Sequence, residues 1–468
     1  MQLRIFNTLS RKVEPICASD ANSIRFYTCG PTVYDYAHIG NFRTFVFEDV
    51  LRRTMHFFGL QVIQAMNITD VDDKTIKGAK AMGLPLSEFT KKYKEAFFED
   101  LKTLRVEPVE FYPAATDYIP QMIDMCKKLL EAKVAYIGSD GSVYFAIQKF
   151  PEYGKLSHLH LEDLKEGASE RSTQDEYGKE QPSDFVLWKA YDPERDGDVF
   201  WDSPFGPGRP GWHLECSVMA QDILGETIDL HAGGVDLIFP HHENEIAQSE
   251  CCSGTCFSKM WVHVEHLLVD NKKMSKSLKN FYTLRDLIQK GYSGISIRFM
   301  LIQTHYRMQM NFTFQGLESA KASLARIQDF IRRLQEYKEE QCTGSIESIL
   351  KNSMDAFKSA LADDVNTPLA LAALFDMIRR VNLACDTFAL SKDEAMHCLE
   401  LLKEMDRVLG ICIFDDELVP KEIQALVQER LTARREKNWQ RSDELREQIS
   451  KLGYLIEDTP QGSRAKKK

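Results

Sequence analysis

The stretch that decides the fold is residues 26–47, which read FYTCGPTVYDYAHIGNFRTFVF. Apolar and other residues alternate over 24–29, as they do in a strand, and Gly30-Pro31 ends that pattern with turn chemistry. From about Asn41 apolar residues recur at helical spacing, and Gly59 closes the helix. A strand, a tight turn and a helix open a nucleotide-binding α/β unit, so this pattern predicts a doubly wound sheet.

The turn within this stretch carries residues that suit phosphate binding. A helix N-terminus presents N–H groups and the positive end of the helix dipole to an anion. Gly40 would let a nucleotide come close to the backbone, and His38 could donate a hydrogen bond to a phosphate oxygen. A histidine packed beside a glycine in an ordinary turn fits the same residues, so this motif alone decides nothing.

A second motif far downstream favours phosphate binding over an ordinary turn. Lys273-Met274-Ser275-Lys276-Ser277 follows an apolar run over 262–269. Two lysines with two hydroxyls suit a triphosphate whose charge grows in a transition state, although a lysine-rich loop is often only solvated surface. The two motifs, in this order and at this separation, resemble the paired nucleotide motifs of class I aminoacyl-tRNA synthetases.

That resemblance implies a catalytic set of His38, Gly40, Asn41, Lys273 and Lys276, with Lys276 in closest contact with ATP. Magnesium would accompany the ATP. The family usually has a second histidine where this chain has Asn41, and an asparagine side chain can still donate a hydrogen bond there.

Composition bounds the class of protein. With 468 residues we expect two to four domains, and a hydrophobic content of 43% is ordinary for a globular chain. No apolar run approaches the roughly 20 residues that span a bilayer, and the N-terminus MQLRIFNTLSRK has no apolar h-region, so we expect no secretion signal. Eleven irregularly spaced cysteines do not look like a disulfide framework, which favours a reducing cytoplasm. The net charge of −11 implies that any RNA contact comes from local basic patches.

The region after the first helix predicts a strand, a helix start and an insertion. Residues 61–67 read as a strand, and Thr69 at its end is either a substrate contact or a helix cap. We expect the acids at 70, 72 and 73 to stabilise a helix N-terminus. Residues 113–190 read as an insertion whose polar part, 162–181, should be an exposed loop.

A candidate metal site emerges from three short motifs, GWHLEC at 211–216, HAGGVD at 231–236 and PHHENE at 240–245. His241 and Glu245 stand at i and i+4, which puts both side chains on one face of a helix. Cys29 and Cys216 can supply two sulfurs, and a set of two cysteines, a histidine and a carboxylate suits zinc. A surface ion pair and buried free cysteines would explain the same residues.

These motifs bring the resemblance down to one family, because nearly the whole chain resembles bacterial-type cysteinyl-tRNA synthetases. The resemblance implies one zinc ion per chain on Cys29, Cys216, His241 and Glu245. The ion would select the substrate, since zinc binds a thiolate far better than an alcohol and a plain pocket separates cysteine from serine poorly. The neighbours His242, Glu243 and Asn244 would then support the ligands or face solvent.

The same resemblance assigns residues to the substrates. It makes Trp212 a wall of the cysteine pocket, with Gly30, Thr69 and His231 nearby. It also implies that three further residues border the adenosine, and Asp236 is a plausible ribose acceptor; the three are Gly233, Gly234 and Asp236.

The C-terminal third reads as helices. Amphipathic segments between 317 and 409 predict a helical bundle, and a separate basic unit follows with helices at 421–435 and 442–452. The family reads the anticodon in this last unit. Carried over by matching residues, the base contacts would be made by Arg434 (or its neighbour Arg435), Trp439, Asp443 and Asp458.

The fold class that follows is α/β, with a Rossmann-like doubly wound parallel sheet, an inserted connective domain, an α-helical bundle and a small C-terminal anticodon-binding domain. We expect the catalytic domain at 1–112 and 191–260, the insertion at 113–190, a lysine-motif and stem-contact region at 261–315, the bundle at 316–412 and the last domain at 413–468.

The function that this resemblance implies is that of a cysteine–tRNA ligase, which uses ATP and L-cysteine and transfers cysteine to the terminal ribose of tRNA(Cys). We expect the enzyme to be cytoplasmic and monomeric, without contact to a membrane. A related ligase with an amino-sugar acceptor would lack the C-terminal unit. A zinc hydrolase would leave the lysine motif unexplained, and a non-catalytic RNA-binding module would leave the metal residues unexplained.

Overall fold

The computed structural model describes residues 1–19, 23–159, 184–275, 278, 280–340, 345–387, 389–414, 420–459 and 462–467. The chain forms two compact units, Met1–Ile411 and Cys412–Lys468. No helix in the described ranges is both long and apolar enough to cross a membrane.

A four-stranded parallel sheet forms the centre of the first unit, in the order β10-β9-β3-β4. The strands and the helices that connect them are β3 (Ser23–Thr28), α1 (Ile39–Phe57), β4 (Gln61–Met66), α7 (Trp212–Leu224), β9 (Ile228–Gly234), α8 (Glu243–Ser253) and β10 (Ser258–Val264). The direction of winding reverses between β3 and β9, and ligands of such sheets bind beyond the carboxyl ends of the strands at that point. Cys29 follows β3, and Gly233 and Gly234 end β9, so the reversal lies at the predicted site residues.

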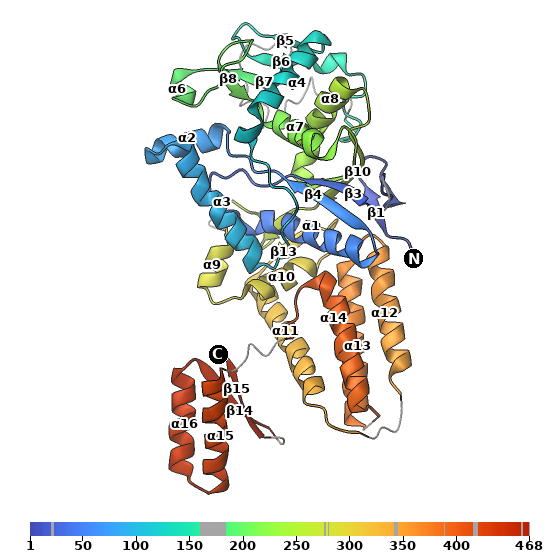
Figure 1. Cartoon of the computed structure of the whole chain (residues 1–468), viewed down its shortest axis with the longest axis vertical. Helices are drawn as coiled ribbons and strands as arrows, with labels where there is room; N and C mark the ends of the chain where they lie inside the picture. Colours follow the sequence, from blue (N-terminus) through green and yellow to red (C-terminus); the bar gives the residue numbers. More distant parts are fainter. Residues whose placement is uncertain are drawn as a thin grey trace. The chain divides into compact units, whose positions relative to one another are not determined.

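Helices cover both faces of this sheet, with α1 on one side and α7 and α8 on the other (Figure 1). The alternation of side chains along the strands decides which residue meets which helix. Thr28 bonds Gln64, which bonds Arg52 of α1, whereas His231 bonds Glu245 of α8. The predicted α/β doubly wound class is confirmed.

The ends of α1 and α2 follow from capping. The helix α1 begins at Ile39, two residues before the predicted start, because the His38 ring accepts a hydrogen bond from the Asn41 N–H. The Asp72 carboxylate caps α2 (Asp73–Met82) by accepting from the Thr75 N–H at 2.7 Å, which confirms the predicted helix start. The helix α3 (Leu86–Thr103) follows.

A second, antiparallel sheet of order β5-β6-β7-β8 lies between β4 and α7 in the chain. Its strands are β5 (Ala135–Ile137), β6 (Val143–Phe145), β7 (Phe185–Ala190) and β8 (Gly208–Pro210). The helices in this part of the chain are η1 (Ala115–Tyr118), α4 (Ile119–Glu131), η2 (Ile147–Lys149) and α6 (Pro193–Asp196). The predicted polar loop at 162–181 lies outside the described residues.

The lysine motif is attached to a small sheet of order β12-β11-β13. Its strands are β11 (Leu267–Val269), β12 (Lys272–Lys273) and β13 (Met310–Phe312), and the helices α9 (Leu284–Gln289) and α10 (Gly294–Ile302) lie between β12 and β13 in the chain. The strands β1 (Arg4–Asn7) and β2 (Lys12–Pro15) pair in a separate antiparallel sheet. Asp270 and Asn271 connect β11 to β12 with φ of 49° and 60°, the backbone that a tight two-residue hairpin turn requires.

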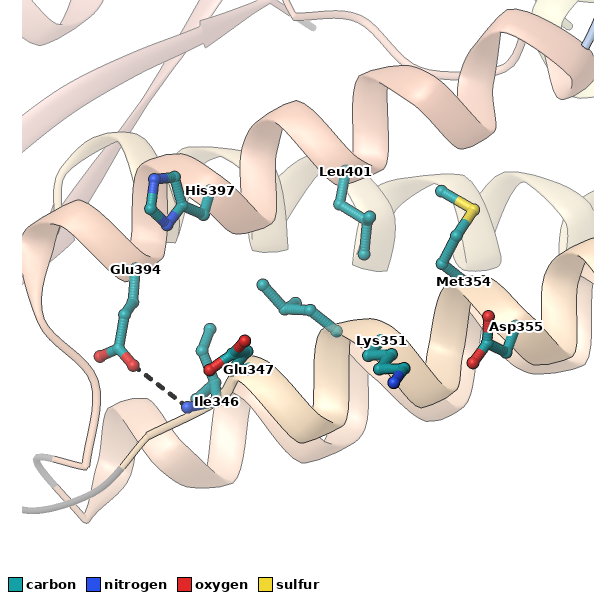
Figure 2. Close-up of a pocket in the computed structure, with 9 residues that line it drawn as sticks. Ile346, Glu347, Lys351, Met354, Asp355, Glu394, His397 and Leu401 are labelled. Carbon is teal, nitrogen blue, oxygen red and sulfur yellow. Dashed lines mark hydrogen bonds between the residues drawn. The ribbon is translucent and has the colours of Figure 1, made fainter.

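A helical bundle completes the first unit, as the periodic segments predicted. It consists of α11 (Phe314–Gln335), α12 (Glu347–Ala362), α13 (Thr367–Asp386) and α14 (Lys392–Leu409). A groove of about 340 Å³ lies between α12 and α14, where the Ile346 N–H donates to Glu394 (Figure 2). This groove contains none of the predicted site residues.

The second unit packs two helices against a hairpin. The elements are α15 (Lys421–Arg435), α16 (Trp439–Lys451), β14 (Tyr454–Thr459) and β15 (Gly462–Lys467). The helix α16 starts three residues earlier than predicted, because the Asn438 side chain accepts from the Arg441 N–H and caps it there. Trp439 therefore lies in the first turn of the helix rather than in the loop before it.

Candidate metal and nucleotide site

Two sulfurs from distant parts of the chain meet at the end of β3. The Sγ atoms of Cys29 and Cys216 are 3.8 Å apart, although 187 positions separate the two residues in the chain. Cys29 follows β3, and Cys216 lies in the second turn of α7, which covers this face of the sheet. Both side chains are buried.

The predicted i,i+4 pair completes this cluster. His241 Nε2 lies 2.9 Å from Glu245 Oε1, and Cys29 Sγ lies 3.9 Å from the same oxygen. One donor atom from each of these residues and from Cys216 lies within 4.8 Å of all the others. Two sulfurs, an imidazole and a carboxylate at such distances fit a tetrahedral zinc ion. The buried cluster can therefore hold a metal ion.

The electrostatics of the cluster favour the ionised forms of Glu245 and Cys216, but not that of Cys29. Burial would raise the pKa of Glu245, but the charges of His231 and His241 outweigh burial and lower that pKa to about 2. Burial would also raise the pKa of Cys216, but a hydrogen bond from Cys29 and the charge of His241 lower it to about 6. Burial and then Cys216 raise the pKa of Cys29, so one proton is retained between the two sulfurs. Thiolate and carboxylate are the forms that bind a metal.

A second set of donors overlaps the first, and sequence reasoning missed it. Cys29 and Glu245 also lie within 4.8 Å of ring nitrogens of His231 and His242. His242 Nε2 is 3.3 Å from Cys29 Sγ, and His231 Nε2 is 2.8 Å from Glu245 Oε2. The first set has two sulfurs and the second has one, so the first is the better zinc site.

The two residues after His242 are buried and structural, so of the two expected roles, support or solvent, the structure favours support. Glu243 accepts hydrogen bonds from the Gly154 and Ser157 N–H groups at 2.9 and 2.8 Å. Asn244 bonds the Tyr153 hydroxyl at 2.5 Å. They tie the start of α8 to the inserted region and thereby hold His241 and Glu245 in place.

Further histidines orient the imidazoles of the cluster. His241 Nδ1 lies 2.8 Å from His213 Nδ1, and His242 Nδ1 lies 2.8 Å from His263 Nε2. A partner on one ring nitrogen fixes the other as a ligand, which is how metal-binding histidines are usually held. The sequence signal was the concentration of histidines, because five of the 12 in the chain lie between positions 213 and 263.

The predicted cysteine-pocket residues adjoin this cluster. The Trp212 ring lies 4.2 Å from the His241 ring and is 40% exposed, as a pocket wall would be. The Thr69 hydroxyl donates to Glu215 at 2.8 Å and accepts from Asn67 at 3.1 Å. A Cβ at Gly30 would lie 1.8 Å from the Asn67 carbonyl oxygen, so only glycine fits there.

The two nucleotide motifs also come together. The His38 Nδ1 accepts from the Asn41 N–H at 3.1 Å, which assigns the proton of the neutral ring to Nε2. The Asn41 side chain accepts from the His38 N–H at 3.2 Å, so it closes the capping box of α1. The Met274 methyl would lie 3.1 Å from a Cβ added at Gly40. The Ile39 N–H donates to the Tyr282 carbonyl at 3.0 Å.

The other predicted nucleotide residues lie at the end of β9 and on the lysine hairpin. A Cβ at Gly234 would lie 2.6 Å from Asp236 Oδ1, and one at Gly233 would lie 3.0 Å from the His242 ring. Lys273 is exposed on β12. Lys276 lies outside the described residues.

The predicted anticodon residues lie in the second unit. Trp439 is 59% exposed, an unusual position for a tryptophan, and Asp443 is exposed on the same helix. Arg434 is half-buried near the end of α15, and its neighbour Arg435 is exposed. Asp458 lies in β14, and its side chain is outside the described residues.

Three known families match successive parts of the chain. The family of class I (C) tRNA synthetase catalytic domains matches residues 15–322, the DALR domain matches residues 356–414, and the cysteinyl-tRNA ligase anticodon-binding domain matches residues 416–464. The cysteine–tRNA ligase of Protochlamydia amoebophila (strain UWE25) is 59% identical over 99% of this chain and 98% of that protein. The chain belongs to the cysteine–tRNA ligase family.

Membership of the cysteine–tRNA ligase family agrees with the other similarities. The cysteine–tRNA ligase of Chlamydia felis (strain Fe/C-56) is 55% identical over 99% of this chain and 98% of that protein. A methionyl-tRNA synthetase from Mycobacterium tuberculosis, solved with methionyl-adenylate, aligns with a TM-score of 0.60 at 13% identity, over 84% of this chain and 90% of that one. At that identity the similarity shows the class I fold alone.

Proposed function

We propose that this chain is a cysteine–tRNA ligase, which condenses L-cysteine with ATP to cysteinyl-adenylate and then transfers cysteine to the terminal ribose of tRNA(Cys). Identity of 59% along the whole chain to a cysteine–tRNA ligase supports this reaction. The observation that carries the proposal is the buried cluster of Cys29, Cys216, His241 and Glu245 at the winding reversal of the sheet. A thiol-selective site belongs at that position in an enzyme that must distinguish cysteine from serine.

The four cluster residues would hold one zinc ion. When bound, zinc selects a thiolate over a neutral hydroxyl and lowers the pKa of the thiol it binds. The chain's own residues would orient the rest of the substrate, with Trp212 against its side chain and Gly30, Thr69 and His231 around it. Trp212 and His241 are in ring contact, which supports a pocket that opens directly onto the cluster.

Adenylation would depend on position and charge, because phosphoryl chemistry of this kind needs no covalent intermediate with the protein. His38 would donate from Nε2 to a phosphate, and Asn41 would hold His38 in that tautomer through the cap of α1. Gly40, Lys273 and Lys276 would line the phosphates, with Mg²⁺ on the ATP. Gly233, Gly234 and Asp236 would border the adenosine. The contact between Gly40 and Met274 supports this pairing of the two motifs.

The second unit would read the anticodon through Arg434, Trp439, Asp443 and Asp458. An exposed tryptophan at the start of α16 can stack on an unpaired base, which supports this role. We also propose that the enzyme is a cytoplasmic monomer with the domain limits given above. The match to an anticodon-binding domain favours a tRNA acceptor over an amino sugar.

The test is cysteine-dependent exchange between ATP and pyrophosphate, run beside serine and followed by charging of tRNA. We expect exchange with cysteine and not with serine, and charging of tRNA(Cys). Exchange without charging would contradict the tRNA acceptor. Absence of exchange from protein that contains zinc would contradict the ligase and favour a hydrolase.

A further inference from the structure

A buried arginine on the nucleotide-binding helix holds two other segments of the chain. Arg43 of α1 is 2% exposed. Its Nη1 donates to the carbonyl oxygens of Glu265 at 2.7 Å and His266 at 2.6 Å. Its Nη2 donates to the carbonyl oxygen of His305 at 3.3 Å and to that of Met308. One guanidinium thus joins α1 to two segments that lie more than 200 positions away.

These four carbonyls lie before the first residues of β11 and β13, two strands of the small sheet that carries the lysine motif. Glu265 and His266 directly precede β11, and the segment 305–308 ends two positions before the start of β13, its parallel partner. The His266 carbonyl also accepts from the Met310 N–H at 3.1 Å, so it is shared by the arginine and the sheet. The strand β11 then turns into β12, which ends at Lys273.

The far end of the same region is also tied to α1. The Ile39 N–H donates to the Tyr282 carbonyl, and Met274 lies over Gly40. The helix α1 therefore contacts the lysine region, residues 265–282, before the lysine motif, at the motif and after it. Arg43 is the side chain that makes the first of these connections.

The chemistry of this connection needs a guanidinium. Because Arg43 bonds main-chain carbonyls, it positions the backbone of both segments whatever their side chains are. Burial lowers the pKa of Arg43 to about 10, and the charge of Glu265 raises it only in part, so the cation stays protonated at neutral pH. A planar fork with five donors can reach two separate segments at once, whereas an ammonium group is a single point of charge.

We propose that Arg43 is a positioning residue, which fixes the hairpin carrying Lys273 relative to His38 and Gly40 and thereby sets the rate of adenylation. The effect on the rate rests on the proposed function, whereas the link that Arg43 makes between α1 and the hairpin rests on the structure alone. The four carbonyls that Arg43 bonds belong neither to the buried cluster nor to the predicted cysteine pocket. The effect of Arg43 should therefore appear in the catalytic rate and leave cysteine binding unchanged.

The test compares Arg43→Lys with Arg52→Lys. Arg52 is a matched control on the same helix, since it is also buried but bonds Glu110 and Gln64 rather than the lysine region. We expect Arg43→Lys to lower kcat of cysteine-dependent pyrophosphate exchange by about 10- to 100-fold, as a misplacement of about 1 Å can. Zinc content and KM for cysteine should not change. Arg52→Lys should lower Tm and leave kcat unchanged.

A second measurement does not depend on activity. Hydrogen–deuterium exchange of the peptide covering 265–275 should become faster in Arg43→Lys and stay as in the parent protein in Arg52→Lys. Equal kcat losses in the two variants, or unchanged amide exchange at 265–275 in Arg43→Lys, would overturn the inference. If the parent protein shows no pyrophosphate exchange, the proposed function fails, and the amide exchange still decides whether the tether exists.

Discussion

At the scale of single residues, Cys29 has two positions in the fold, next to the end of β3 and within the buried cluster of donors. It directly follows β3, the strand at which the winding of the sheet reverses, and its sulfur lies among donors from α7 and α8. Burial raises the pKa of its thiol, and so does the neighbouring Cys216. A thiol in such surroundings loses its proton readily only when a cation takes the proton's place, which is the behaviour of a metal ligand.

The corresponding prediction concerns Cys29→Ser. We expect the affinity for zinc to fall, because a serine hydroxyl is a poor zinc ligand. The loss should exceed the roughly 10- to 100-fold that removal of a hydrogen-bond partner of a ligand costs. Discrimination against serine in pyrophosphate exchange should fall with it. Elemental analysis gives the zinc content, and Cys398→Ser, at a buried cysteine of α14, is the matched control. Full zinc content in Cys29→Ser would rule out the proposed ligand set.

At the scale of elements, the N-terminus of α1 depends on a reciprocal cap and on a close neighbour. His38 and Asn41 exchange hydrogen bonds, which explains how an asparagine can stand where the family usually has histidine. A Cβ at Gly40 would lie 3.0 Å from the His38 ring and 3.1 Å from the Met274 methyl, so a side chain there must displace these neighbours. The element is therefore shaped by the lysine region as much as by its own sequence.

This arrangement predicts that Gly40→Ala costs activity rather than stability. Alanine favours a helix over glycine by about 1 kcal/mol, so Tm should hold or rise. Displacement of the His38 ring and of Met274, beside the lysine segment, should lower kcat of pyrophosphate exchange about ten-fold. Gly316→Ala is the matched control, since its Cβ would also lie 3.1 Å from a methionine methyl in the first turn of a helix. Equal activity in the two variants would contradict the prediction.

At the scale of the whole molecule, the chain is built from two compact units that carry different proposed tasks. The first contains the metal cluster and both nucleotide motifs, and the second contains the exposed Trp439. The two proposed steps of the reaction should therefore be separable by removing one unit.

A chain that ends at Ile411 should still activate cysteine. We expect its pyrophosphate exchange to match that of the full chain, because every described residue proposed for adenylation lies before that point. Charging of tRNA(Cys) should fall by at least about 100-fold, since each lost base contact is worth about 1–3 kcal/mol. Charging at the full rate would show that the second unit does not read the anticodon. Circular dichroism controls for folding of the shortened chain.

Much of the fold and several site residues could be predicted because their signals are local. Alternation over 24–29 and helical spacing after Asn41 predicted β3 and α1, and the i,i+4 spacing put His241 beside Glu245. The start of α16 was misjudged because a side-chain cap at Asn438 moved it. His242 as an alternative donor and Arg43 as a tether were missed, because nothing adjacent in the chain reveals either partner.

The sequence by itself determined the elements, the order of the motifs and the chemical types of the site residues, since hydrophobic period, turn chemistry and donor identity are written locally. Only the tertiary structure decided which donors meet. Cys29 and Cys216 come within 3.8 Å because α7, which carries Cys216, packs against the sheet in which β3 lies beside β9. The two predicted nucleotide motifs lie together where the Arg43 guanidinium and the Ile39 N–H bond the backbone of a region more than 200 positions away. Burial then sets the charge states, because desolvation and the neighbouring charges exist only once those segments are in contact.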